Sequence, residues 1–183
     1  MSCDISLGRL EPCKDSVGGI TAIYFINYTA GLLDSATFSA DEVITGFASA
    51  LTLYKYDLKG ANSFEETNEN SRENGTSFFT QVGTVVLKKQ DPATRKEMKL
   101  LSWGRPQVVV EFYNTGASNA SRYVLAGIEN GCETAPSATS GAAMGDLNGY
   151  NIVFTGNEKS PANFIDPTII DDNMTSHDYI TSK

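Results

Sequence analysis

Paired acidic residues are the feature of this sequence whose type and spacing come closest to catalytic chemistry. Glu65 stands beside Glu66, and Asp146 is followed further along the chain by Glu158. Two carboxyl groups can cleave a glycosidic bond when both line a cleft and one of them has a raised pKa. The surrounding sequence indicates neither condition, so we interpret these residues as parts of an acidic surface.

Two further patterns match known loops only in part. The glycine-containing run at 139–150 lacks the Gly-Lys-Ser/Thr ending with which a phosphate loop neutralises phosphate charge, so we interpret it as a flexible approach to the next strand. Asp171 and Asp172 lack the alternating oxygen ligands and the glycine of a calcium loop. Neither run supports a ligand site.

Cysteine and histidine usage opposes a metal site. The cysteines are Cys3, Cys13 and Cys132, an odd number without a short paired spacing, and the one histidine is His177. Zinc sites and disulfide frameworks both need closely spaced or paired ligands. We therefore predict reduced structural thiols, no metal, no cofactor and no catalytic residue; that is, a protein that is not an enzyme and has no small-molecule substrate.

Length and charge restrict the remaining classes. The 183 residues suffice for one domain with a substantial core, and no linker or internal repeat divides them. The net charge of −8 opposes tight binding to nucleic acid, because phosphate contacts require clustered Lys and Arg. No apolar run is long enough for a membrane helix, and the N-terminal residues lack the layout of a signal peptide. We expect synthesis and assembly in the cytoplasm, with no membrane partner.

Strands dominate the elements that would position any site. Residues 20–27 are apolar on both faces, which predicts a strand covered on both sides. Residues 78–89 also have two partly apolar faces. The other strand candidates lie at 41–47, 51–58, 107–113, 123–129 and 151–156. We predict a mainly β fold, a β-sandwich or flattened barrel with one flanking helix.

The flanking helix is predicted at 91–103. Asp91 can cap its first turn, and Pro92 suits the first helical position. The cations Arg95, Lys96 and Lys99 fall on the solvent side, where they either contact an acidic neighbour or remain solvated. Trp103 at the helix end is expected to close the hydrophobic core.

A polar segment at 59–77 separates two apolar strand candidates. It is rich in Asn and Glu and contains one large apolar side chain, Phe64. It forms either a long protruding hairpin or a loop, and neither buries enough apolar surface to order itself, so we expect a partner to order it. We place the domain at 1–165, with this segment as its arm, and interpret 166–183 as an acidic C-terminal extension.

Three stretches resemble a known family. They are CDISLGRLEPCKDSVGGITAIYFINY from Cys3, KGANSFEETNENSRENGTSFF from Lys59 and AMGDLNGYNIVFTGNEKSPANF from Ala143. Together they are similar to virion structural proteins of tailed bacteriophages, in particular to tail tube proteins. The resemblance implies a β-sandwich with one flanking helix, an arm that reaches the next subunit, and stacked, commonly hexameric rings around a channel. The acidic residues after Asp166 depart from that pattern and leave open a specialised ring near the head or baseplate.

The resemblance gives the surface residues expected roles. The partners it implies are copies of the same chain, other tail proteins of the virion, and DNA in transient, non-specific passage. The expected oligomer interface comprises Phe64, Phe78, Phe79, Arg95, Lys96 and Lys99. The residues expected to face an acidic channel, which would repel DNA from its wall, are Glu65, Glu66, Glu69 and Asp146.

Two alternatives remain open from the sequence. A head decoration or head-tail connector subunit would attach to a capsid or portal and would not polymerise alone. A carbohydrate-binding or adhesin module would present exposed aromatic side chains on a concave face, and the candidates for that role are Tyr54, Tyr56 and Tyr123.

Overall fold

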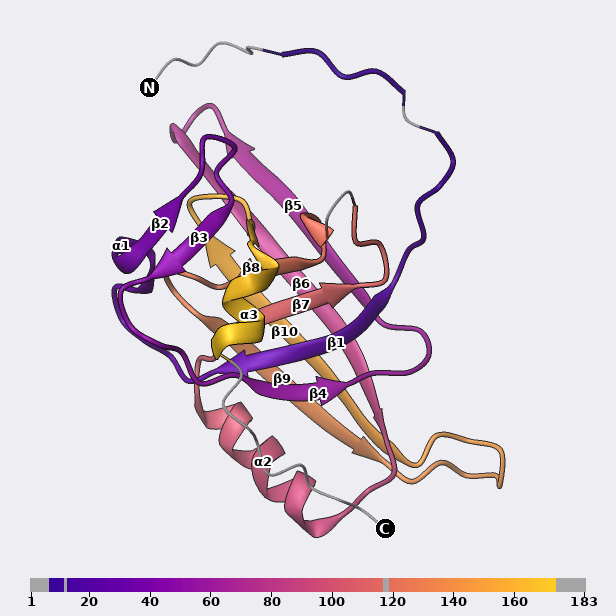
Figure 1. The fold of residues 1–183 in the computed structure, drawn as a ribbon. Coiled ribbons are helices and arrows are strands. Elements are labelled where there is room, and N and C mark those ends of the chain that lie inside the picture. Colours follow the sequence, from indigo (N-terminus) through magenta and orange to yellow (C-terminus); the bar gives the residue numbers. More distant parts are fainter. Residues whose placement is uncertain (1–6, 12, 117–118, 174–183) are drawn as a thin grey trace.

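A computed structural model describes residues 7–11, 13–116 and 119–173 and contains two β-sheets with three helices (Figure 1). This confirms the predicted mainly β, sandwich-like fold with a flanking helix. The elements are β1 (Ile20–Ile26), α1 (Leu32–Ser35), β2 (Ala36–Phe38), β3 (Ile44–Phe47), β4 (Tyr54–Asp57), β5 (Ser63–Ser71), β6 (Thr76–Lys88), α2 (Pro92–Trp103), β7 (Gln107–Phe112), β8 (Tyr123–Ala126), β9 (Cys132–Thr139), β10 (Gly149–Glu158), β11 (Asn163–Ile165) and α3 (Pro167–Asn173).

The strands form one seven-stranded and one four-stranded sheet. The seven-stranded sheet, sheet A, has the order β2-β3-β11-β8-β7-β1-β4, and the four-stranded sheet, sheet B, has the order β5-β6-β10-β9. All neighbours in sheet B are antiparallel. Sheet B is built from long hairpins, and its two outermost strands, β5 and β9, are its edges.

The two sheets enclose the main hydrophobic core. One face of β1 and β7 contributes Ile23 and Val108, and the facing side of sheet B contributes Val85, Ile152 and Phe154, all fully buried. This packing requires strict alternation along β6, where Gln81, Gly83 and Val85 point inward and their neighbours point outward. Sheet B therefore has one covered face and one outer face.

The opposite face of sheet A is covered by the chain itself. Ala22 and Tyr24 of β1 pack there with Leu125 of β8 and with Ile169 and Ile170 of α3. The expectation that residues 20–27 form a strand covered on both sides agrees with the buried pattern of β1. Residues 167–170 of α3 complete a core, which corrects the interpretation of 166–183 as a separate extension for that portion. Residues 174–183 lie outside the described residues.

Helix α2 lies at one end of the sandwich, beside β9. As predicted, the carboxylate of Asp91 caps it, accepting a hydrogen bond of 2.8 Å from the Thr94 backbone N–H. Met98 is the residue of α2 buried in the main core, and the backbone carbonyl of Leu101 accepts a hydrogen bond from the Thr134 hydroxyl of β9. None of the helices in the described ranges is long and apolar enough to cross a membrane.

The segment at 59–77 takes the hairpin form of the two that the sequence left open. β5 pairs with β6 from Ser63, opposite Thr84, to Ser71, opposite Thr76. Pairing between β6 and β10 ends at Phe79, so only the last pairs of the hairpin extend beyond the sheet. The backbone pairing of β5 orders this segment within the chain, which corrects the expectation that a partner must order it.

Candidate functional site

The outer face of sheet B belongs to neither of the two hydrophobic cores. Its side chains are all partly or fully exposed, whereas the inward-pointing residues of β10 are buried. The register of the three strand pairs places the following residues on this face: Ser63, Glu65, Thr67, Glu69, Phe78, Thr80, Val82, Thr84, Val86, Lys88, Glu133, Ala135, Ser137, Asn151, Val153, Thr155 and Asn157. We call it the sheet B face.

The sheet B face is acidic and rich in hydroxyl and amide groups. Its charged residues are Glu65, Glu69 and Glu133 against one cation, Lys88, at the end of β6. The Thr80 hydroxyl lies between the side-chain oxygens of Glu69, at 3.0 Å, and Asn157, at 3.2 Å. Excess negative charge on an open sheet opposes contact with polyanions.

Glu65 and Glu66, which were expected to face a channel together, lie on opposite sides of sheet B. Glu65 is on the sheet B face opposite Val82, whereas Glu66 points inward opposite Gln81. Glu66 accepts hydrogen bonds from the Gln81 side chain, at 3.0 Å, and from the Ala162 backbone N–H, at 2.6 Å. Glu66 therefore ties the edge strand to the rest of the chain, which corrects its expected role.

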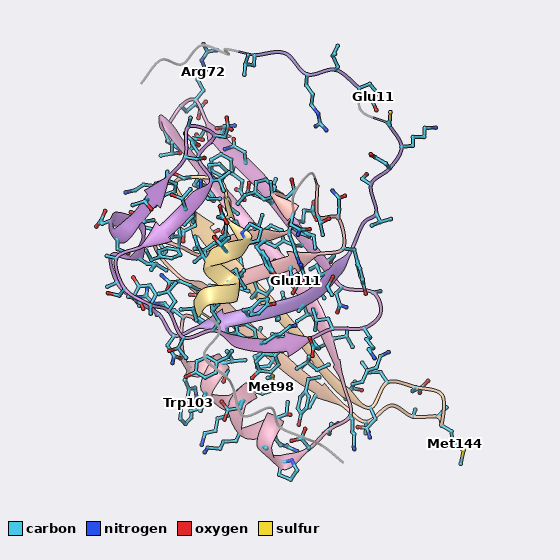
Figure 2. All side chains as sticks on the ribbon, viewed as in Figure 1. Glu11, Arg72, Met98, Trp103, Glu111 and Met144 are labelled. Atoms are coloured by element: carbon cyan, nitrogen blue, oxygen red, sulfur yellow. The ribbon has the colours of Figure 1, made fainter. Side chains whose placement is uncertain are left out.

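Asp146 is also separated from the other acidic residues. It lies in the loop between β9 and β10, where its carboxylate accepts hydrogen bonds from the backbone N–H groups of Ala142 and Ala143, both at 2.8 Å, which lower its pKa. Gly149 at the end of this loop pairs with Lys88, whereas Glu69 pairs with Phe78 near the other end of β6. At a rise of about 3.3 Å per residue, these two positions on β6 lie about 33 Å apart. The labelled residues Arg72 and Met144 mark these two ends (Figure 2). Asp146 closes its own loop and lies apart from Glu65 and Glu69 of the sheet B face.

Neither carboxylate pair considered from the sequence forms in the structure. Glu65 and Glu66 are divided by the sheet, and Asp146 and Glu158 lie at opposite ends of β10. Glu158 is buried, and this burial raises its pKa. Its carboxylate accepts a hydrogen bond of 2.8 Å from the Asn130 backbone N–H. Glu158 thus holds the turn between β8 and β9.

The aromatic residues expected at an oligomer interface occupy three different environments. Phe64 packs against the main core, with its ring centroid 6.3 Å from those of Phe112 and Phe154, which corrects the expectation that it lies on another subunit. Phe78 is on the sheet B face near the hairpin tip and is 37% exposed. Phe79 points to the other side and is half-buried.

The three cations of α2 are exposed, as the helical pattern predicted. The Lys99 ammonium lies 4.4 Å from the ring centroid of Trp103. Trp103 itself is 73% exposed, so the expectation that it closes the core is wrong. The apolar side of α2 therefore continues past the core onto the surface.

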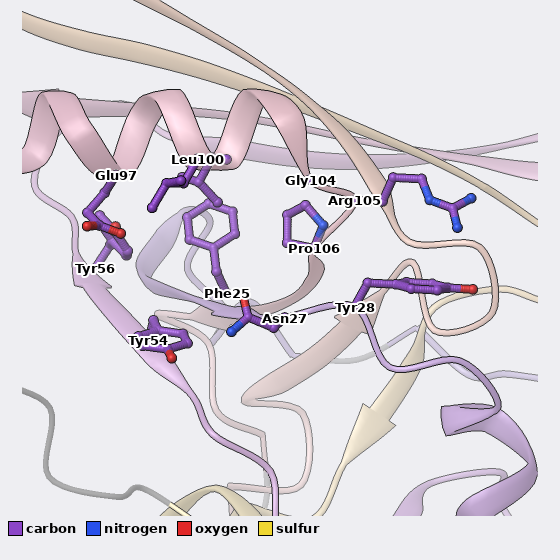
Figure 3. A pocket seen from close by; sticks show the side chains of 11 residues that line it. Phe25, Asn27, Tyr28, Tyr54, Tyr56, Glu97, Leu100, Gly104, Arg105 and Pro106 are labelled. Carbon is purple, nitrogen blue, oxygen red and sulfur yellow. The ribbon is translucent and has the colours of Figure 1, made fainter.

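An open cavity of about 310 Å³ lies between α2 and the neighbouring ends of β1 and β4 (Figure 3). The residues lining it are Phe25, Asn27, Tyr28, Tyr54, Tyr56, Glu97, Leu100, Leu101, Gly104, Arg105 and Pro106. Figure 3 shows Phe25 and Tyr56 beneath the helix and the Arg105 guanidinium over the Tyr28 ring, 4.6 Å from its centroid. Burial raises the pKa of Tyr56 to about 12, so its hydroxyl remains protonated at neutral pH. We call this the α2 cavity.

A buried polar cluster stabilises sheet A, and sequence reasoning missed it. Glu111 is 2% exposed and accepts hydrogen bonds from the Tyr24 hydroxyl, at 2.7 Å, and from the Arg122 guanidinium, at 3.0 and 2.5 Å. Burial raises the pKa of Tyr24, and the bond to Glu111 adds to that effect. The one available signal was a charged residue within the apolar run of β7. Within the described ranges, no group of acidic, Cys or His side chains could hold a metal ion.

Comparisons with protein-family models, with curated proteins and with solved structures found no significant match to this chain.

Proposed function

We propose that this chain is a structural subunit of a tailed-bacteriophage virion, of tail tube type, which assembles into stacked rings around a channel for DNA. The observation that carries this proposal is the sheet B face. It is a broad, open, acidic surface in a sandwich whose other sheet is covered on both faces by its own chain. Such a face suits the wall of a channel, because a few kT of repulsion keeps a polyanion from adhering to it.

The edges of sheet B supply a mechanism for ring formation. β5 and β9, of nine and eight residues, are the two edges of the sheet. Unpaired backbone groups along an edge are a template for pairing with another chain. Pairing of β5 in one copy with β9 in the next is a head-to-tail contact, which closes into a ring when the rotation permits. In such a ring the sheet B faces form one continuous acidic wall that carries Glu65 and Glu69 from each copy.

Concentration-dependent sedimentation combined with negative-stain microscopy tests this proposal. A tail tube subunit yields rings or tubes as the protein concentration rises. A persistent monomer that binds capsids contradicts it and favours the decoration or connector alternative. Repeating the experiment in moderate salt distinguishes two kinds of contact between subunits. Edge pairing through backbone hydrogen bonds is less sensitive to screening by salt than contacts between surface charges.

The carbohydrate-binding or adhesin alternative is favoured by one observation of its own. Tyr54 and Tyr56 line the α2 cavity, as a concave aromatic site requires, although Tyr123 is buried in sheet A. The cavity volume lies at the small end of the range of ligand sites, about 300–1,000 Å³. Binding of a glycan array by a stable monomer would support this alternative over the ring.

A further inference from the structure

Asparagine followed by glycine occurs three times in the chain, and the structure places the three pairs in different surroundings. The pairs are Asn74-Gly75, Asn130-Gly131 and Asn148-Gly149. Such a pair is a labile setting for the asparagine amide, because glycine has no Cβ atom to hinder attack by its backbone nitrogen on the preceding side chain. The surroundings of each pair therefore decide where this chemistry can occur.

The reaction is a loss of ammonia that consumes only water. The glycine backbone nitrogen gives its proton to hydroxide and attacks the side-chain carbonyl carbon of the asparagine. The new bond closes a five-membered succinimide ring, and the side-chain amide nitrogen leaves as ammonia. Water then opens the ring at one of its two carbonyl carbons, which yields either aspartate or isoaspartate, whose main chain runs through the former side-chain carbon. Both products carry a carboxylate, ionised at neutral pH, in place of a neutral amide.

Asn74 and Gly75 lie in the turn between β5 and β6, at the tip of the hairpin. The two strands pair as far as Ser71 and Thr76, and the turn residues 72–75 are all exposed. Gly75 has a φ of 63°, and nothing lies within 4 Å of a Cβ atom built there. Asn74 donates its backbone N–H to the Ser71 hydroxyl, at 3.3 Å, a bond that the reaction does not use. Neither the Asn74 side-chain amide nor the Gly75 N–H is hydrogen-bonded to another described residue.

Asn130 and Gly131, by contrast, are held in the turn between β8 and β9. The Asn130 side-chain amide donates a hydrogen bond of 2.8 Å to the Asn157 carbonyl, and its backbone N–H donates one of 2.8 Å to the Glu158 carboxylate. The attacking nitrogen would be that of Gly131, which is buried and donates its N–H to the Gly127 carbonyl at 3.0 Å. Ring closure at Asn130 therefore requires this turn to open first.

Asn148 and Gly149 are held by sheet B. Gly149 is buried at the start of β10, where it pairs with Lys88 of β6 on one side and with Thr139 of β9 on the other. The Asn148 carbonyl accepts a hydrogen bond of 2.6 Å from the Lys89 backbone N–H. Rotation of this peptide towards the Asn148 side chain therefore requires local opening of the sheet.

We propose that Asn74 is a site of spontaneous deamidation and that the fold protects Asn130 and Asn148 from the same reaction. The modification adds a negative charge to the hairpin tip, where Arg72 and Glu73 otherwise balance each other (Figure 2). The isoaspartate product also adds a main-chain carbon to a short turn. This site goes beyond the proposed function, because the reaction needs no second copy of the chain.

Peptide mass spectrometry of the full chain tests the assignment. The folded protein is incubated at mildly alkaline pH, at a dilution at which sedimentation shows a monomer, and samples are digested with trypsin over time. Trypsin releases residues 73–88, in which Asn74 is the one asparagine, and residues 123–159, in which fragmentation separates Asn130 from Asn148. A digest without incubation gives the background that arises during digestion.

Conversion of amide to carboxylate in the folded chain should be at least about tenfold faster at Asn74 than at Asn130 or Asn148, because the latter two require local opening. In guanidinium chloride, which unfolds the chain, the three rates should converge. Equal rates in the folded chain, or no conversion at Asn74, would overturn the proposal. A difference of the same size in the unfolded chain would also overturn it, because neighbouring residues and not the fold would then select Asn74.

Asn74→Gln is the matched control variant. It keeps an exposed amide at the tip, but attack by the Gly75 nitrogen would have to close a six-membered ring, which forms far more slowly. Residues 73–88 of this variant should keep their mass while those of the wild type convert, and the unfolding temperatures should agree because position 74 is exposed. Loss of ammonia from the variant at the wild-type rate would contradict the succinimide route.

The mass spectrometry and the microscopy separate this site from the proposed function. Conversion at Asn74 in a protein that forms no rings would support the deamidation site and contradict the tail tube proposal. Rings formed by a chain in which the monomer does not convert at Asn74 would do the reverse.

Discussion

Gly83 of β6 lies beneath the aromatic ring of Phe154, its direct partner on β10, so closely that a Cβ atom at position 83 would overlap the ring. Phe154 is fully buried and occupies the space between the sheets that a side chain at position 83 would need. This contact explains a glycine in the middle of the longest strand, where glycine otherwise costs stability.

Gly83→Ala should therefore lower the free energy of unfolding by about 1–3 kcal/mol, the usual cost of overpacking a core. Gly145→Ala is the matched control, because nothing lies within 4 Å of a Cβ at that exposed loop position. Urea denaturation of both variants measures the difference. Equal stabilities of the two variants would mean that Phe154 moves aside at no cost.

The neighbours Glu65 and Glu66 should differ in how much stability is lost when their side chains are removed. Glu66→Ala should cost about 1–3 kcal/mol, because the Ala162 backbone N–H and the Gln81 side chain lose their acceptor. Glu65→Ala should change stability by no more than about 0.5 kcal/mol, since its side chain is on the open sheet B face. Thermal unfolding at neutral pH compares them. A larger loss for Glu65→Ala would contradict the register of β5.

Glu158→Gln should stabilise the protein more as the pH rises. Burial raises the pKa of Glu158 in the folded chain, so its contribution to stability is greatest below the pKa of the unfolded chain, near 4.5, and declines as the pH increases through the folded value. Glutamine keeps an oxygen acceptor for the Asn130 N–H without the buried charge. Denaturation at pH 4 and pH 7 should show a gap between variant and wild type that widens at pH 7. A stability gap that is smaller at pH 7 than at pH 4 would contradict a raised pKa for Glu158 in the folded chain.

Phe64 and Phe78 distinguish folding from assembly within one hairpin. Phe64→Ala should cost about 3 kcal/mol, because it removes a ring packed near Phe112 and Phe154. Phe78→Ser should leave the unfolding temperature nearly unchanged while weakening assembly in sedimentation, since Phe78 is exposed near the tip. If Phe78→Ser assembles as well as the wild type, the hairpin tip is not part of the interface.

Periodicity in the sequence predicted the core strands and the main helix well. The apolar runs located β1, β7 and β10, and the cap at Asp91 located the start of α2, because these signals are local. β9 escaped detection because its inward residues, such as Thr134 and Pro136, are small or polar, and its order depends on pairing with β10. Tertiary pairing of that kind leaves little trace in one sequence.

The candidate site was harder to predict, since it depends on which face each residue occupies. Alternation along a strand already implies that Glu65 and Glu66 cannot share a face, once β5 is recognised as a strand. The hydrogen bonds of Asp146 to its own loop and the bonds of Glu66 to Gln81 and Ala162 follow only from the folded chain. The α2 cavity likewise combines residues from β1, β4 and α2, whose proximity no local pattern indicates.

A cryo-electron microscopy map of the assembled protein tests the central claim most directly. The account predicts closed rings in which β5 of each copy pairs with β9 of the next and the sheet B face, with Glu65 and Glu69, lines the channel. A ring whose channel wall is basic, or whose sheet B face points outward, would contradict it.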